Sequence, residues 1–209
     1  MKRLIREAAV TASDAQGRGL GLCITSQSPK MYILYDAGAV YEEISSSSDS
    51  SVADLGAYMM GVVTLKQKRK GRQWNASEIE LTAAEQGYGP LVYDVAMAFE
   101  GGLVPDRERV SGSAAGVWDF YRARRPDVKT KPLDDESHPH TRPKIDDTET
   151  MHDPDGDSSL DYAYFIDKAP NVAGLIKNHR LVMKAARGGL DEDEFAWAAA
   201  DYSEEKYAG

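Results

Sequence analysis

The first third of the chain shows the hydrophobic pattern of short strands. The segments "GLGLCITS" (19–26) and "MYILYD" (31–36) predict two strands joined by the turn "SQSPK". The continuous apolar run "AYMMGVVTLK" (57–66) predicts a central strand that is covered on both faces. The serine-rich segment 42–54 predicts a surface loop between them.

The segment 74–82, "WNASEIELT", alternates strictly. Ile79 and Leu81 fall on one face, and Glu78 and Glu80 fall on the other. This period of two predicts a strand with one covered and one solvated face.

Helical spacing of apolar residues begins after Gly87 and Gly89. A helix is predicted that ends at Gly101-Gly102, with Tyr93 and Asp94 on its polar face. A second helix, capped by Ser111 or Ser113, stops at Pro126. The predicted apolar stripes are Leu91, Val92, Val95, Ala96 and Phe99 in the first helix, and Ala114, Val117, Trp118 and Tyr121 in the second.

The remaining chain alternates between strands and helices. Segments 103–110 and 127–133 predict a short strand or turn and a further strand, and 160–168 predicts the last strand. A third helix is expected from Pro170, with Val182 and Met183 on its apolar side, and a final helix over 191–207. The polar, acidic segment 134–159 predicts a long loop.

These elements predict a mixed α/β (α+β) fold. A mostly antiparallel sheet is flanked by helices and carries a C-terminal helical extension. We expect a core over 1–133, an acidic loop over 134–159, and a final strand with helices over 160–209.

Composition narrows the function classes. The 209 residues carry a net charge of −9, which argues against a dedicated DNA-binding protein. The basic run 66–72, "KQKRKGR", is the local exception; it is either a solvated hairpin tip or a contact for nucleic acid or an acidic partner. The single cysteine, Cys23, excludes an internal disulfide and is expected in the core.

Neither a membrane protein nor a metal-binding protein is expected. No apolar run approaches the ~18 residues of a membrane span, and no signal peptide follows the start, so we predict an intracellular protein without a membrane partner. The histidines of the acidic loop, His138, His140 and His152, lack the spacing of a zinc site, and "DPDGDSSLD" departs from a calcium loop. No metal site is therefore predicted.

The stretch "AAEQGYGPLVYDVAMAF" (83–99) carries the main candidate chemistry. Its glycines allow a tight turn between a strand and a helix, and Pro90 suits the first helical position. The first-turn amides of a helix have no partner within the helix and carry partial positive charge, so they favour a pyrophosphate. A purely structural turn is the alternative.

This stretch resembles the acetyl-CoA motif of the GNAT N-acetyltransferases, a strand followed by Q/R-x-x-G-x-G/A and a helix. Gly87 and Gly89 match the motif glycines, whereas Ala84 stands at the opening Gln or Arg, and Pro90 removes one amide. With "PDRERVS" and "VWDFY" downstream, the chain is more similar to GNAT-like proteins of tailed bacteriophages than to cellular enzymes. The resemblance covers residues 57–130.

The resemblance implies an enzyme that binds acetyl-CoA and acetylates an amine on a host or phage protein, in the host cytoplasm or packaged in the virion. It implies Glu78 or Glu80 as the base and Tyr121 as the acid that protonates the thiolate. It implies cofactor contacts from backbone groups of Leu81, Thr82, Gly87, Tyr88, Gly89 and Leu91.

A second hypothesis stays open beside it. The same fold can serve as a virion or interaction component without catalysis, because a fold does not fix a function. In that case the two glutamates are solvated strand residues and Tyr121 is a packing residue.

Overall fold

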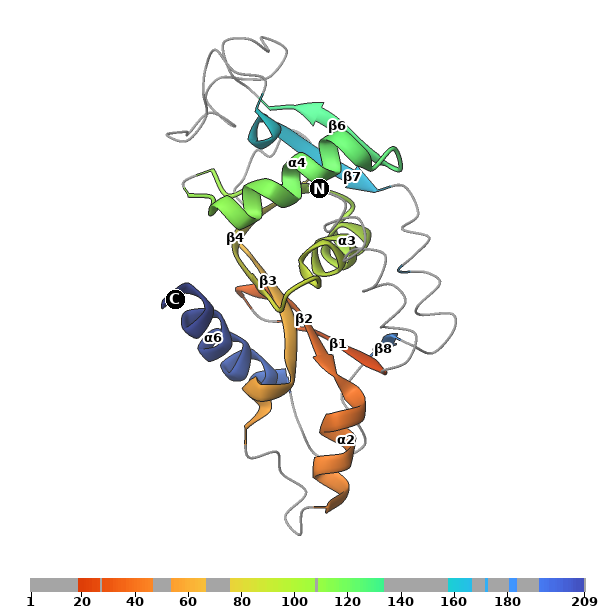
Figure 1. The fold of residues 1–209 in the computed structure, drawn as a ribbon, viewed down its shortest axis with the longest axis vertical. Helices are drawn as coiled ribbons and strands as arrows, with labels where there is room; N and C mark the ends of the chain where they lie inside the picture. Colours follow the sequence, from red (N-terminus) through yellow and green to blue (C-terminus); the bar gives the residue numbers. More distant parts are fainter. Residues whose placement is uncertain are drawn as a thin grey trace. The chain divides into compact units, whose positions relative to one another are not determined.

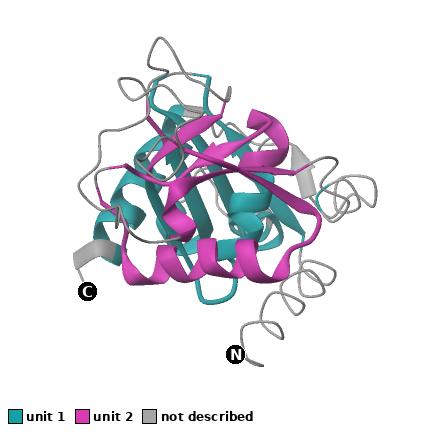
Figure 2. Cartoon of the chain, turned by 90° about the horizontal axis from the view of Figure 1, so that it is seen from above, with its two compact units in different colours: residues 1–64, 81–95, 170–209 teal, residues 65–80, 96–169 magenta. Residues whose placement is uncertain are grey.

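A computed structural model describes residues 19–26, 28–46, 54–66, 76–107, 109–133, 158–166, 172, 181–183 and 192–208. The chain forms two compact units, and Figure 2 shows them in different colours. Unit 1 comprises residues 1–64, 81–95 and 170–209, and unit 2 comprises residues 65–80 and 96–169. The strands β3 and β4 and the helix α3 each contribute residues to both units.

Unit 1 is built on strands from both ends of the chain. β1 (Leu20–Ile24) pairs antiparallel with β2 (Lys30–Asp36) and parallel with β8 (Leu181–Met183). β3 (Met59–Leu65) lies between β2 and β4 (Ser77–Ala84) in the strand order. Its described helices include α2 (Ala37–Ser46), the 3-10 helix η1 (Leu55–Tyr58) and α6 (Glu192–Ala208), and α3 begins in this unit (Figure 1).

The core of unit 1 forms where α6 packs against strand side chains. Phe195, Ala199 and Tyr202 recur at helical spacing on α6, and all three are buried. The Phe195 ring lies 4.6 Å from that of Tyr35 on β2. Burial of each large side chain contributes roughly 1.5–3 kcal/mol. The full cluster is Ile33, Tyr35, Val40, Leu55, Met59, Val62, Ala83, Phe195, Ala199 and Tyr202.

Unit 2 holds the remaining strands. β7 (Tyr162–Ile166) lies between β6 (Val128–Pro132) and β5 (Leu103–Val104) and is antiparallel to both. β5 pairs in parallel with the start of β4 over two residue pairs. The unit also contains η2 (Ser159–Asp161) and α4 (Gly112–Arg124), whose Trp118 ring lies 4.6 Å from that of Tyr164.

The fold is mixed α/β with mostly antiparallel strands, as the sequence predicts. The central strand is confirmed, because β3 is buried on both faces, and so is the alternation of β4. The Ser111 hydroxyl accepts a hydrogen bond from the Ala114 amide, which confirms it as the cap of α4. Cys23 is half-buried and packs against the core of unit 1.

Four predictions about individual segments are wrong. Residues 42–46 belong to α2, which begins where the Asp36 carboxylate accepts a hydrogen bond from the Ala39 amide at 3.0 Å. Residues 181–183 form a strand rather than a helix, because pairing with β1 overrides local helical spacing.

Two further predicted loops cannot be compared, because the segments 67–72 and 134–157 lie outside the described residues.

The other two corrections concern the helix α3 (Gly89–Glu100). Tyr93 and Asp94, predicted on a polar face, are each only 2% exposed. Phe99, predicted in the apolar stripe, is 41% exposed. Residues 91–97 are all buried, so this helix is enclosed on every side for two turns instead of burying a single stripe.

Candidate functional site

The glycine junction, residues 84–91, joins β4 to α3. Gly87 has φ = 91°, a left-handed conformation that favours glycine. Close packing sets the position of the turn: a Cβ on Gly61 of β3 would lie 3.2 Å from the Ala84 Cβ and 3.5 Å from the Val92 Cβ. The glycine at 61 therefore lets the end of β4 and the start of α3 approach β3.

The main-chain donors of the junction divide into two groups. The Tyr88 amide donates to the Glu85 carbonyl at 3.0 Å, so it closes the turn and is not open to a ligand. The first helical bond runs from the Val92 amide to the Tyr88 carbonyl at 3.0 Å. Among the described residues, the amides of Gly87, Gly89 and Leu91 have no hydrogen-bond acceptor.

Four residues of the junction, Gly87, Tyr88, Gly89 and Leu91, were expected to contact a cofactor. Three of them, all except Tyr88, have open amides. Gly87 and Gly89 are half-exposed, whereas the side chain of Leu91 is buried and only its amide belongs to the candidate site. Pro90 has no amide hydrogen. Three open donors around a left-handed turn are an arrangement that can receive phosphate oxygens.

The charge beside the junction is partly neutralised. Glu85 would repel a phosphate, but its Oε1 lies 2.7 Å from the Lys206 Nζ and accepts a hydrogen bond from the Tyr202 hydroxyl at 3.1 Å. Burial, followed by the nearby Glu85 carboxylate, raises the pKa of Tyr202, so its hydroxyl remains a donor at neutral pH.

Leu81 and Thr82 lie on β4 before the junction. Both residues are half-buried. The Thr82 Oγ1 is buried, and it has no hydrogen-bond partner among the described residues. Their predicted backbone contacts to a cofactor stay predictions.

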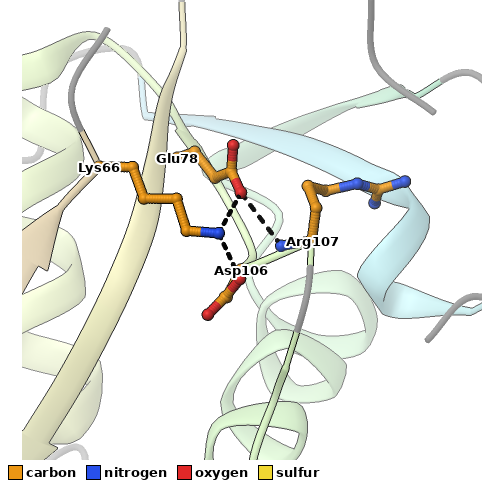
Figure 3. Close-up of polar contacts among 4 residues, drawn as sticks. All are labelled: Lys66, Glu78, Asp106 and Arg107. Atoms are coloured by element: carbon orange, nitrogen blue, oxygen red, sulfur yellow. Dashed lines mark hydrogen bonds and ion pairs between the residues drawn. The ribbon is translucent and has the colours of Figure 1, made fainter. Parts of the chain in front are cut away.

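A second polar group lies in unit 2, at the start of β4 (Figure 3). The Lys66 ammonium lies between two carboxylates, 2.9 Å from the Glu78 Oε1 and 2.8 Å from the Asp106 Oδ1. The Arg107 amide donates to the same Glu78 oxygen at 3.3 Å, while its guanidinium points away and donates to the Leu160 carbonyl. We call Lys66, Glu78 and Asp106 the ion-pair cluster.

The surroundings of Lys66 favour its charged ammonium form. Burial alone would lower the pKa of Lys66, but hydrogen bonds from its ammonium to Asp106 and Glu78 outweigh burial and raise that pKa above its ordinary value. The exposed fractions of the three side chains are between 13% and 15%, so solvent screens the ion pairs only in part.

The two candidate bases therefore differ. The Glu78 carboxylate already contacts the Lys66 ammonium and accepts a hydrogen bond from the Arg107 amide, so its Oε1 is engaged within the protein. Glu80, two residues along β4, is exposed. Of the two, Glu80 is the carboxylate that a substrate can reach.

Tyr121 lies in the interior of unit 2. It is 1% exposed, with ring centroids 6.0 Å from Trp118 and 6.3 Å from Tyr164. The Arg125 guanidinium lies 5.3 Å from the centre of its ring. This position suits packing, and a role as proton donor requires that a substrate reach the buried hydroxyl.

The local sequence does not mark Asp106 or Lys66 as partners of Glu78. Lys66 stands in the basic run 66–72, and Asp106 stands in the segment 103–110 that predicts a short strand or turn. These two residues are 40 positions apart, and only the pairing of β4 with β3 and β5 brings them together. No local pattern carries that information.

Comparison with known proteins adds no relative. The chain matches no protein-family model, no curated protein and no solved structure. In the described part of the chain, no helix is long and apolar enough to cross a membrane. The described residues also contain no group of three or more His, Cys, Asp or Glu that could hold a metal ion.

Proposed function

We propose that this protein binds acetyl-CoA through the glycine junction and transfers the acetyl group to an amine. The proposal rests on the open amides of Gly87, Gly89 and Leu91. These amides lie where β4 ends and α3 begins. Helix N-termini with free amides favour pyrophosphate, the most highly charged part of coenzyme A.

The order of elements supports a GNAT-like fold. β4, α3 and β5 follow one another, with β5 parallel to β4, and α4 and β6 come next. Pairing between β4 and β5 covers only Ser77 with Leu103 and Glu78 with Val104. Short pairing of this kind is what the resemblance leads us to expect of two strands that splay apart.

The chemistry assigned to this chain is direct aminolysis of a thioester. The amine nitrogen attacks the acetyl carbonyl carbon, so that a carbon–nitrogen bond forms and the carbon–sulfur bond breaks. The nitrogen loses one proton to a base, and the coenzyme leaves as a thiolate that takes a proton from solvent. We assign proton removal to Glu80, because its carboxylate is exposed while that of Glu78 is held by Lys66. The acceptor belongs to a host or phage protein, in the host cytoplasm or in the virion.

Thermal unfolding with acetyl-CoA tests the proposal. A ligand that binds only the native state at a hundred times its Kd adds about 2.7 kcal/mol, which is a shift of about 5–11 °C for a chain of this size. Gly89→Asp should abolish the shift, because it places a carboxylate where phosphate binds. Gly112→Asp is the matched control: it alters the first residue of α4, where a Cβ meets nothing within 4 Å.

Two outcomes of this experiment argue against the proposal. The first is an absence of any shift in the wild-type protein. The second is a shift that Gly89→Asp and Gly112→Asp leave equally intact, because a ligand would then bind elsewhere.

A non-catalytic interaction protein is the second candidate function. Two observations favour it: Trp197 on α6 is 75% exposed, and neither Glu78 nor Tyr121 is placed like a free acid or base. Large exposed aromatic residues are typical of the centres of protein interfaces. Trp197→Ser should then weaken copurification with phage particles without changing the melting temperature, whereas unchanged copurification would count against this candidate.

A further inference from the structure

Unit 1 contains a pocket that shares only Glu85 with the glycine junction. Its volume is about 590 Å³, within the range of roughly 300–1,000 Å³ of small-molecule sites. The pocket lies between η1, α6 and the residue that follows β4. Leu55 and Met59, which are 7% and 2% exposed, supply apolar surface.

The polar lining of the pocket is strongly acidic. It carries four carboxylates, from Asp54, Glu85, Asp201 and Glu205, and one ammonium group, from Lys206. Asp201 and Glu205 are four residues apart on α6, so they share one face of the helix, where like charges destabilise it. Neither residue has an ion-pair partner among the described residues, so this charge is open to a ligand.

The pocket already holds one primary ammonium group. The Lys206 Nζ lies 2.7 Å from the Glu85 Oε1 and 5.6 Å from the centre of the Tyr202 ring. A carboxylate beside an aromatic ring is a common environment for an alkylammonium ion. The chain's own side chain thus shows which chemical group this part of the lining accepts.

The lining combines acidic groups with apolar side chains. Four carboxylates stand beside the buried side chains of Leu55 and Met59. This combination suits several ammonium groups joined by methylene chains, since the charges meet carboxylates and the methylenes meet apolar surface. We propose that this pocket binds a linear polyamine, or the same chemistry presented by a lysine-rich peptide.

Calorimetric titration of spermidine into the full chain, without acetyl-CoA, tests this inference. We expect saturable binding of one ligand. Asp201→Asn and Glu205→Gln should each weaken it about two- to fivefold, and the double variant about tenfold, as expected for partly exposed charge pairs. Lys206→Met should tighten binding about two- to fivefold, because a competing ammonium is removed.

Glu204→Gln is the matched control, because Glu204 is exposed on α6 and does not line the pocket. It should change the affinity less than twofold. Circular dichroism of each variant checks that α6 is intact. A dilysine peptide forms a second arm, and the tighter of the two ligands identifies the source of the amine.

Three results would overturn the inference. They are no saturable heat with either ligand, equal weakening by Glu204→Gln and the pocket variants, or Mg²⁺ binding as tightly as spermidine. The inference does not rest on the proposed acetyl transfer, so its failure leaves the acetyl-CoA experiment unaffected, and the reverse also holds.

Discussion

Removal of the Lys66 ammonium should destabilise the protein measurably. Lys66→Met keeps the length of the side chain and removes the ammonium that lies between the carboxylates of Glu78 and Asp106. In the native protein the ammonium lies within 2.9 Å of one and 2.8 Å of the other. Among the described residues, the Glu78 carboxylate would then keep the hydrogen bond from the Arg107 amide alone.

The size of the loss follows from the exposure of the cluster. Exposed ion pairs contribute about 0–1 kcal/mol, and breaking a fully buried pair costs about 3–5 kcal/mol. Side chains that are 13–15% exposed lie between these limits. We therefore expect a loss of about 2 kcal/mol, or a decrease of about 4–8 °C in the melting temperature.

Urea unfolding followed by circular dichroism measures this loss. Arg109→Met is the control, because Arg109 is an exposed cation of the same unit, and its removal should change stability by less than about 0.5 kcal/mol. The triple variant Lys66→Met, Glu78→Gln, Asp106→Asn should be more stable than Lys66→Met alone, because the two carboxylates that contacted the ammonium are replaced by neutral amides. A triple variant that is less stable than Lys66→Met would refute this reasoning.

Four further predictions concern backbone strain and titration. Gly87→Ala should cost about 1–2 kcal/mol in urea unfolding, because φ is 91° there, whereas Gly112→Ala should cost nothing. Gly102→Ala should destabilise the chain in the same assay, because its Cβ would lie 2.6 Å from the Phe165 ring. Burial, with a smaller contribution from Cys23, raises the pKa of Tyr35 to about 12, so stability should fall as the pH rises from 10 to about 12, and Tyr35→Phe should remove that part of the loss. The same substitution should not reduce stability at pH 7, because the buried Tyr35 hydroxyl has no hydrogen-bond partner among the described residues.

The order of apolar and polar residues predicted those elements whose burial and capping depend on neighbouring residues in the sequence. The continuous apolar run of β3 and the alternation of β4 appear where expected, because burial on two faces or one leaves a direct trace in sequence. The Ser111 cap was also predictable, since its acceptor and donor are three residues apart.

The wrong predictions concern residues whose environment is set by segments distant in sequence. Tyr93 and Asp94 look like a polar face until other elements enclose α3 on all sides. Val182 and Met183 have helical spacing, but β1 supplies strand partners, Gly21 and Leu22, that lie 161 residues away in sequence. In both cases a distant segment decides the environment.

In the candidate site, too, some features follow from the local sequence and others depend on distant segments. The tight turn and the open amides of Gly87 and Gly89 follow from the local sequence of glycines and proline. The pairing of Glu78 with Lys66 and Asp106 depends on three separate segments. Sequence therefore identified a candidate anion site but not which glutamate is already paired.

We propose that the open amides of Gly87, Gly89 and Leu91 bind the phosphates of coenzyme A. Amide chemical shifts of the isotope-labelled protein, recorded during titration with coenzyme A, report on these groups individually. We expect saturable shifts at Gly87, Gly89 and Leu91, with a much smaller change at Gly112. Shifts confined to other residues, or no shift at millimolar ligand, would contradict it.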